Sequence, residues 1–554
     1  MFAILLLGFA QQPLDLLPSP ALALAVWEDP GATVRAALDG EVARRVLASG
    51  IVEELQRRPG YGMAALAWSA VSAPVGGDAA AFADALLGRG VAAALIARPD
   101  AEPGLLVVTR MGDPEAGADC LRQLARLAQI STIPLESELW EIPLGEAFLA
   151  RVGDWLIFAS RAEEIAGVRA RLEAYAASGP AALPALPPSA QALRGRATGG
   201  ESAPSLWVWL DGALLRAGGH PPLPEDLGIS LLGGDLHECL RVAEWAGATL
   251  RVDGRSLRAE LLVPEPPELG STHAPFRPDA PAVSLPKIGD AMMRGVIVRD
   301  FGGWYNARDQ YASAAAVAAS VEGDGNLRLL FGRDFGPEVL AWLEPHARLL
   351  AARNPDATAR ELGLELPAAA LGLRLLPGAP AGLGQGFVNA FLAAVTFANF
   401  QAGAADERQL LLDLEKTPDG GTLYLARRPR LADGAIAPLS HNAEPALFVG
   451  ADGEIWISSS IGLLREIVAA PRQVATSDAS WVELDLSAFR PLLARAHDAI
   501  VARRLLVNGG DFAAAQRFAD LVASAAGLLD GARVRFGPLE GGCGARLEVF
   551  AHGE

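Results

Sequence analysis

Hydrophobic and polar positions along the chain follow two periods, one typical of helices and one typical of strands. Ile165, Val168, Leu172 and Tyr175 are spaced by three or four residues, which places them on one face of a helix. Short apolar runs bounded by turns predict strands that pair locally, and Asp253-Gly254 is a strong hairpin signal. Locally paired strands mixed with helices predict an α+β fold, with antiparallel sheets that carry helices on one face.

An internal repeat organises these elements. Four blocks of strands and helices recur in the same order, and their two copies are 105–110 and 410–415, 147–172 and 446–468, 206–217 and 481–496, and 248–263 and 532–550. The order predicts two tandem homologous units, 18–265 and 283–552, each an antiparallel sheet covered by helices. The stretch 264–286 between them has seven prolines and is expected to be an extended linker.

Helices are expected mainly in the first part of each unit, over 32–89 and 287–353.

In the second block, Ser160 and Glu163 have the spacing of a capping box at the start of a helix. The other copy of this block has no glutamate at the matching position. The sequence therefore predicts a capping box at the start of this helix in the first unit, and an incomplete one in the second.

Composition narrows the class of protein. Of 554 residues, 51% are hydrophobic and 20% are charged, which allows large cores and excludes a disordered chain. With 47 basic and 65 acidic residues, the net charge is −18, so neither nucleic acid nor an anionic membrane is expected as a general partner. Three cysteines exclude a disulfide framework, and the sequence leaves open whether any two of them pair.

The start of the chain bears on localisation. Residues 2–9 form an apolar run, and the small residues Gly8 and Ala10 are of the kind that a signal peptidase reads. We predict a signal peptide over 1–10, cut after Ala10, and an extracytoplasmic location in the periplasm or outside the cell. The run is short and lacks a basic n-region. A buried first strand or a misassigned start codon are the alternatives.

No segment is predicted to span a membrane. The best candidate is the uncharged stretch between Arg374 and Asp406, which prolines and glycines interrupt. Its helical part, 387–400, carries Asn389 and Asn399. This pattern is typical of a buried helix in a soluble core.

Parts of the second unit resemble a known family. They read FGPEVLAWLEPHARLLAARN (335–354), LPAAALGLRLLP (366–377), FVNAFLAAVTFANFQAG (387–403) and the block 446–468. In this order the chain resembles a family of large secreted proteins, with a domain of unknown function, that is common in planctomycete-type bacteria. The resemblance implies export and a tandem α+β build. It brings no catalytic residues with it.

Candidate cofactor and metal motifs are weak. The turn with Gly382, Gly384 and Gly386 follows a strand and opens a helix, but its third glycine comes one residue too early for a dinucleotide-binding turn. A flexible start of a helix is the better interpretation. Asp235, His237 and Cys239 have metal-ligating side chains, but the helical pattern around them would separate the three.

Candidate catalytic residues are equally weak. Ser458, Ser459 and Ser460 end a strand without a histidine nearby in the sequence, and Glu483 and Asp485 share one face of a strand. The tryptophans are interpreted as core residues rather than as a sugar or peptide platform; they are Trp207, Trp209, Trp245, Trp304, Trp342, Trp456 and Trp481. We therefore predict no catalytic, cofactor-binding or metal-binding residue and no cofactor.

A duplicated fold without duplicated polar clusters predicts a non-enzymatic exported protein, acting as an envelope scaffold or a binding module. Its partner would be an envelope protein or an apolar ligand. A first alternative is a lipid-binding protein, suggested by the Ala-rich helix 387–400. A second is an extracytoplasmic hydrolase whose site is assembled from distant residues, for which Ser458–Ser460 and His441 are the hint.

Overall fold

In a computed structural model, the chain divides into two compact units. Unit 1 contains 1–220, 242–264 and 548–554, and unit 2 contains 221–241 and 265–547. The structure describes residues 12–18, 21–58, 60–88, 90–98, 102–127, 139–144, 147–178, 186–198, 205–217, 225, 231, 236–264, 282–356, 366–404, 409–429, 443–475, 479–509, 511–539 and 542–551. The predicted signal peptide and most of the predicted linker lie outside these residues.

Unit 1 is built on an antiparallel sheet whose described strands run in the order β4-β5-β6-β3-β2-β1-β7-β8-β9. Their bounds are β1 Ala21–Trp27, β2 Val91–Ile96, β3 Gly104–Arg110, β4 Leu139–Leu144, β5 Ala147–Val152, β6 Trp155–Ala159, β7 Ser205–Asp211, β8 Trp245–Val252 and β9 Ser256–Val263. The helices are α2 Pro30–Leu38, α3 Glu41–Ala48, α4 Ile51–Gln56, α5 Tyr61–Ser72, α6 Ala79–Leu87, α7 Pro114–Leu127, α8 Ala162–Ser178, α9 Pro188–Thr198 and α10 Gly212–Ala217. A further helix, α12 at Leu236–Val242, belongs to unit 2 except for its last residue.

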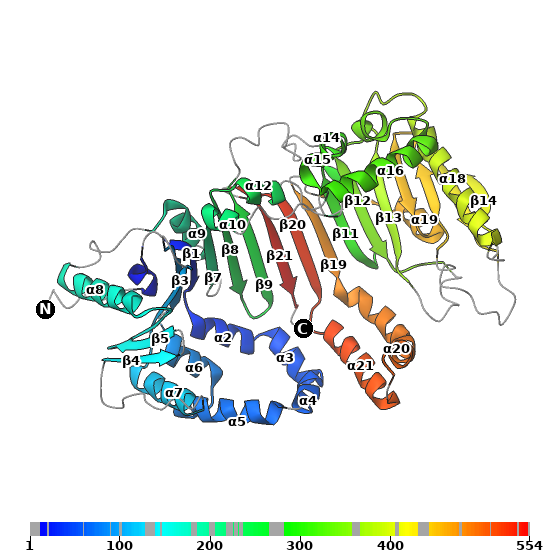
Figure 1. Ribbon diagram of the computed structural model, residues 1–554. Coiled ribbons are helices and arrows are strands. Elements are labelled where there is room, and N and C mark those ends of the chain that lie inside the picture. Colours follow the sequence, from blue (N-terminus) through cyan, green and yellow to red (C-terminus); the bar gives the residue numbers. More distant parts are fainter. Residues whose placement is uncertain are drawn as a thin grey trace. The chain divides into compact units, whose positions relative to one another are not determined.

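The strands of unit 2, called here the unit 2 sheet, pair antiparallel in the order β14-β15-β16-β17-β13-β12-β11-β19-β20 (Figure 1). These strands are β11 Ala291–Val298, β12 His346–Ala352, β13 Ala368–Arg374, β14 Leu411–Lys416, β15 Thr422–Arg427, β16 Ala446–Val449, β17 Glu454–Ser458, β19 Ser480–Asp485 and β20 Gly531–Leu539. A two-stranded sheet joins β10 Val283–Pro286 to β18 Arg472–Ala475, and β21 is Gly542–Phe550. The helices are α14 Phe301–Asn306, α15 Arg308–Tyr311, α16 Ala314–Phe331, α18 Leu383–Ala404, α19 Ile461–Ala469, α20 Leu486–Asn508 and α21 Phe512–Ala526.

The α+β class is confirmed, but helices cover both faces of the unit 2 sheet. Along β13, Ala368 and Ala370 belong to the buried cluster that contains α19. Leu373 belongs to the cluster that contains α18, and Leu371 packs against it. The expectation of helices on one face is therefore wrong, because these strands are apolar on both sides and each side needs its own cover.

The amphipathic helices are confirmed. In α8, Ile165 and Val168 are fully buried and Leu172 packs against the same cluster. In α19, Ile461 and Leu464 are buried in the same way. The spacing of three and four residues thus indicates the buried face correctly in both helices.

The expected helical parts differ in outcome. Helices α2–α6 cover 30–87 almost as predicted. The expected helix-rich segment 287–353 instead begins with β11 and ends with β12. The Ala- and Leu-rich run of β12 pairs on both sides, with β11 and β13, and this tertiary pairing outweighs its local helix propensity.

Two further predictions about the repeat are wrong in detail. The matched strands 105–110 (β3) and 410–415 (β14) do not occupy equivalent positions in their sheets. Strand β3 pairs with a neighbour on each side, whereas β14 pairs with β15 alone among the described strands. The capping box is also misplaced. The Oγ of Ser160 accepts a hydrogen bond from the backbone N–H of Leu105, 3.1 Å away, whereas Ser460 caps its helix by accepting from the N–H of Leu463.

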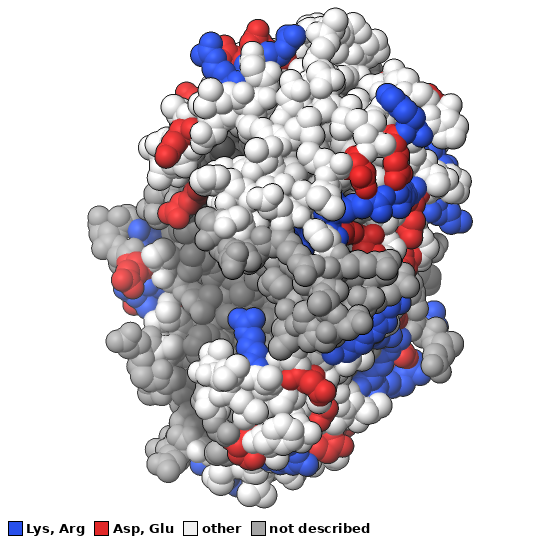
Figure 2. Space-filling view, turned by 90° about the vertical axis from the view of Figure 1, so that its right-hand side faces the viewer, with Lys and Arg blue, Asp and Glu red and all other residues white. Residues whose placement is uncertain are grey.

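Helix α18 is less buried than predicted. A third of its apolar window, Leu383–Gly403, is buried, and Phe397 and Phe400 are exposed. By length and composition alone it is the one helix in the described residues that could cross a membrane. Figure 2 views the side on which α18 and β14 lie in Figure 1, and its upper half shows a broad uncharged surface.

Candidate functional site

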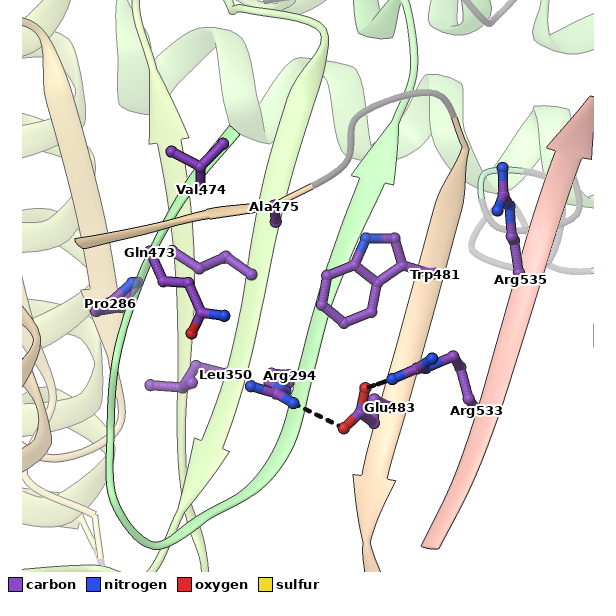
Figure 3. A pocket seen from close by; sticks show the side chains of 11 residues that line it. Pro286, Arg294, Leu350, Gln473, Val474, Ala475, Trp481, Glu483, Arg533 and Arg535 are labelled. Atoms are coloured by element: carbon purple, nitrogen blue, oxygen red, sulfur yellow. Dashed lines mark hydrogen bonds and ion pairs between the residues drawn. The ribbon is translucent and has the colours of Figure 1, made fainter. Parts of the chain in front are cut away.

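A pocket of about 250 Å³ lies on one face of the unit 2 sheet. Its lining comes from β10, β11, β12, β18, β19 and β20, and consists of Leu285, Pro286, Arg294, Leu350, Gln473, Val474, Ala475, Trp481, Glu483, Arg533 and Arg535 (Figure 3). Strand β18 passes across one side of this pocket, so exposed residues of β18 form part of its wall.

Strand register brings three charged side chains into one row across the pocket. Glu483 on β19 lies directly opposite Arg294 on β11 and directly opposite Arg533 on β20. Its carboxylate accepts hydrogen bonds from Arg294 Nη2 at 2.8 Å and from Arg533 Nε at 3.1 Å (Figure 3). The row follows from antiparallel pairing, in which residues directly opposite place their side chains on the same face.

The electrostatics of this row favour an anion. Burial by itself raises the pKa of Glu483, but the hydrogen bonds from Arg294 and Arg533 outweigh it and hold the pKa below its usual value. Glu483 is therefore ionised at neutral pH. One carboxylate faces the two guanidinium groups of Arg294 and Arg533, which leaves an excess of positive charge in this row.

The side chains of the row are not equally accessible. That of Glu483 is 17% exposed, whereas those of Arg294 and Arg533 are 46% and 50% exposed. Each guanidinium carries five N–H donors in a planar fork, and Glu483 takes only some of them. Donors on both arginines thus remain available to an incoming acceptor.

The other side of the pocket is apolar. Leu285 and Leu350 are buried at its base. Trp481 comes two residues before Glu483 in β19 and therefore lies on the same face of the sheet. It packs against the cluster that contains Leu285 and also lines the pocket. The core role predicted for Trp481 is therefore only part of what this side chain does. The pocket can hold an anionic group attached to a small apolar body.

The structure separates the two carboxylates that the sequence paired. Glu483 faces the two arginines, while Asp485 is the N-cap of α20 and accepts from the backbone N–H of Ala488 at 3.2 Å. An acid pair for glycoside hydrolysis is thus absent at this place among the described residues. The arginines that make the site were missed by sequence reasoning, because they lie about 190 and 50 positions from Glu483 along the chain.

The three serines have structural roles. Ser458 and Ser460 are buried, and the Ser460 hydroxyl donates to Asp356 Oδ2 at 2.7 Å. Ser459 Oγ accepts from the backbone N–H of Ala369 at 2.9 Å. A nucleophile needs access to substrate and a nearby base, and His441 lies outside the described residues.

The metal and cofactor motifs gain no support. Asp235 and the side chain of His237 lie outside the described residues, Cys239 is buried in α12, and no metal-binding group of three or more residues occurs in the described part of the chain. Cys120, Cys239 and Cys543 form no disulfide. Before the glycine turn, β13 pairs antiparallel with both neighbours, whereas a dinucleotide-binding turn belongs to a parallel βαβ unit.

The chain was compared with known families, curated proteins and solved structures. No family profile and no curated protein matches it. It is similar to three crystal forms of TP0453: form I (10% identity, 48% of this chain, 81% of that chain, TM-score 0.25), form IV (11%, 46%, 82%, 0.26) and form III (11%, 46%, 80%, 0.25). At these TM-scores the likeness supports no argument about function. The resemblance to the planctomycete-type family stays a prediction.

Proposed function

We propose that the chain is a non-enzymatic, exported binding module of the cell envelope, and that it holds a partner protein through the pocket on unit 2. The observation that supports this most directly is the Arg294–Glu483–Arg533 row beside Trp481. Glu483 orients both guanidinium groups, so that their remaining donors are pre-arranged for a carboxylate of the partner.

The size of the pocket favours a protein partner over a whole lipid. Sites that enclose a small ligand usually measure about 300–1,000 Å³. At about 250 Å³, this pocket suits one acidic side chain or a terminal carboxylate with its neighbouring apolar group. The apolar wall of Leu285, Leu350 and Trp481 keeps an apolar ligand with an anionic head as the second candidate.

We also propose that the two units are homologous copies, 18–265 and 283–552, joined by the linker 264–286. Supporting this, the strand order β6-β3-β2-β1-β7-β8 in unit 1 has the same connectivity as β17-β13-β12-β11-β19-β20 in unit 2. The pocket row has no equivalent in unit 1: Trp209 stands there in the place of Glu483 and is buried. Binding through this pocket would then be a property that only the second copy acquired.

A site-specific photo-crosslinker tests the proposed function. Gln473 is exposed and lines the pocket, so a crosslinking residue there should capture a discrete envelope protein in the producing cells. The variant R533Q removes one charged donor and leaves the Glu483–Arg294 bond in place. A charged hydrogen bond contributes about 1.5–3 kcal/mol, which corresponds to a loss of capture of about tenfold or more.

Controls make the outcome decisive. A crosslinker at Leu329, an exposed position on α16, should not capture the same protein. Equal capture by the wild type and R533Q would reject the pocket as the contact. The mass of the mature protein tests export separately, since cleavage after Ala10 leaves Gln11 as the first residue.

A further inference from the structure

The helical hairpin α20–α21 ends in an exposed apolar tip. The two helices lie side by side and extend beyond the ends of β19 and β20 (Figure 1). Helix α20 has 23 residues and is therefore about 34 Å long. At its end, Leu506 is 86% exposed and Val507 is 71% exposed, and Phe512 at the start of α21 is 58% exposed.

The hairpin does not need these three side chains for its own packing. Its seam is formed by Val501, Ala515 and Ala519, with Ile500 and Leu505 packed against them. The chain turns at Gly509, whose φ of +61° suits glycine and ends α20. The three side chains of the apolar tip therefore do not contribute to the packing between α20 and α21. A soluble surface seldom gathers three such large apolar side chains at a protruding turn unless they make a contact.

Positive charge lies directly behind the tip. Arg503, Arg504 and Arg517 are exposed there, and Arg504 stacks over the ring of Phe518 at 4.6 Å. Arg503 and Arg517 form no ion pair with any residue that the structure describes. The acids of this hairpin are Asp511, whose carboxylate caps α21, and Asp498 and Asp520, which lie within hydrogen-bond distance of the His497 ring. Within α20, Arg503 and Arg504 are the charged residues nearest to Leu506 and Val507, so cations stand directly behind the apolar tip.

We propose that the α20–α21 tip inserts into the surface of an anionic lipid bilayer. Leu506, Val507 and Phe512 enter the boundary between headgroups and acyl chains, and the arginines behind them contact lipid phosphates. Apolar side chains in front and cations behind are what such an interface accepts. A protein partner fits less well, because the described part of the tip is a narrow turn between two helices and not a broad face. The proposal does not depend on the unit 2 pocket.

Flotation of the full-length protein with vesicles tests this. We expect binding to vesicles of phosphatidylglycerol and phosphatidylcholine in equal parts, and weak binding to phosphatidylcholine alone. The variant L506D/V507D should lower the partition coefficient by about tenfold or more. R503Q/R517Q should lower it by about fivefold for each arginine on anionic vesicles, and this loss should vanish at about 1 M salt.

The matched control is L329D, since Leu329 is 85% exposed on α16 of the same unit. It should bind vesicles like the wild type. Absence of binding by the wild type, or equal loss in L329D and L506D/V507D, would overturn the proposal. A wild-type dimer that L506D/V507D converts to a monomer, with no vesicle binding, would instead assign the tip to a contact between two copies. If R533Q loses capture of the partner protein but binds vesicles like the wild type, the pocket and the tip act independently of each other.

Discussion

The substitution Gly372→Ala should destabilise unit 2 by a steric clash that can be calculated from the sheet. Gly372 on β13 lies directly opposite Trp456 on β17. A Cβ at this position would lie 2.6 Å from both Cζ2 and Cη2 of the indole ring. Carbon atoms in contact normally lie about 3.5–4.0 Å apart, so the clash is about 1 Å deep.

Neither partner can move away easily. Trp456 is fully buried, and β13 is held on both sides by β12 and β17. Overpacking of this kind costs about 1–3 kcal/mol. The backbone of Gly372 does not have a positive φ, so alanine also gains about 0.4–1 kcal/mol through the unfolded state. We therefore expect a net loss of about 1–2 kcal/mol in the free energy of unfolding.

Calorimetry measures the effect as a fall in the melting temperature of unit 2, by about 2–4 °C for each kcal/mol. Gly323→Ala is the matched control in the same unit, because a Cβ there meets nothing within 4 Å. Gly323 lies inside α16, so its replacement should stabilise by up to about 1 kcal/mol.

A double-mutant cycle with Trp456→Phe tests the cause. The indole N–H of Trp456 has no acceptor among the described residues, so phenylalanine loses ring volume without losing a hydrogen bond. The two substitutions together should cost less than the sum of their separate costs, by about 1 kcal/mol. The reasoning is refuted if Gly372→Ala is neutral, or if the two costs simply add.

Two more predictions concern buried polar groups. Ser460→Ala removes both the cap of α19 and the donor to Asp356, and should cost about 1–3 kcal/mol in urea unfolding; Ser313→Ala, which removes a cap alone, should cost less, and equal losses would contradict this. Burial, with Arg348 adding to it, lowers the pKa of His346 from 6.5 to about 4, so the unfolded chain binds the proton more readily. Stability should therefore fall as pH drops from about 6.5 to about 4, and less steeply in His346→Gln; parallel pH curves for the two proteins would show that His346 is not responsible.

Much of the local structure could be predicted from the sequence. The hairpin at Asp253-Gly254 forms, with Gly254 at a φ of +56° and Asp253 N–H bonded to the Ser256 carbonyl. Trp207 and Trp456 are core residues, as expected. These outcomes depend on turn chemistry and hydrophobic spacing, which act over a few residues.

The site could not be found in the same way. Glu483 could be singled out in the sequence as one of a pair of acids, but no motif or spacing pointed to Arg294 or Arg533. They meet because β19 lies between β11 and β20 in a particular register. A shift of one residue in either pairing would turn the arginine to the other face of the sheet.

The sequence by itself determined the class of fold, the amphipathic faces of α8 and α19 and the hairpin at Asp253-Gly254, because those follow from neighbours a few positions apart. Tertiary structure decided that 346–352 is a strand, that helices cover both faces of the unit 2 sheet, and that a row of arginine, glutamate and arginine lines a pocket. The physical reason is that strand pairing joins residues far apart in the chain. Its free energy comes from contacts that no local pattern records.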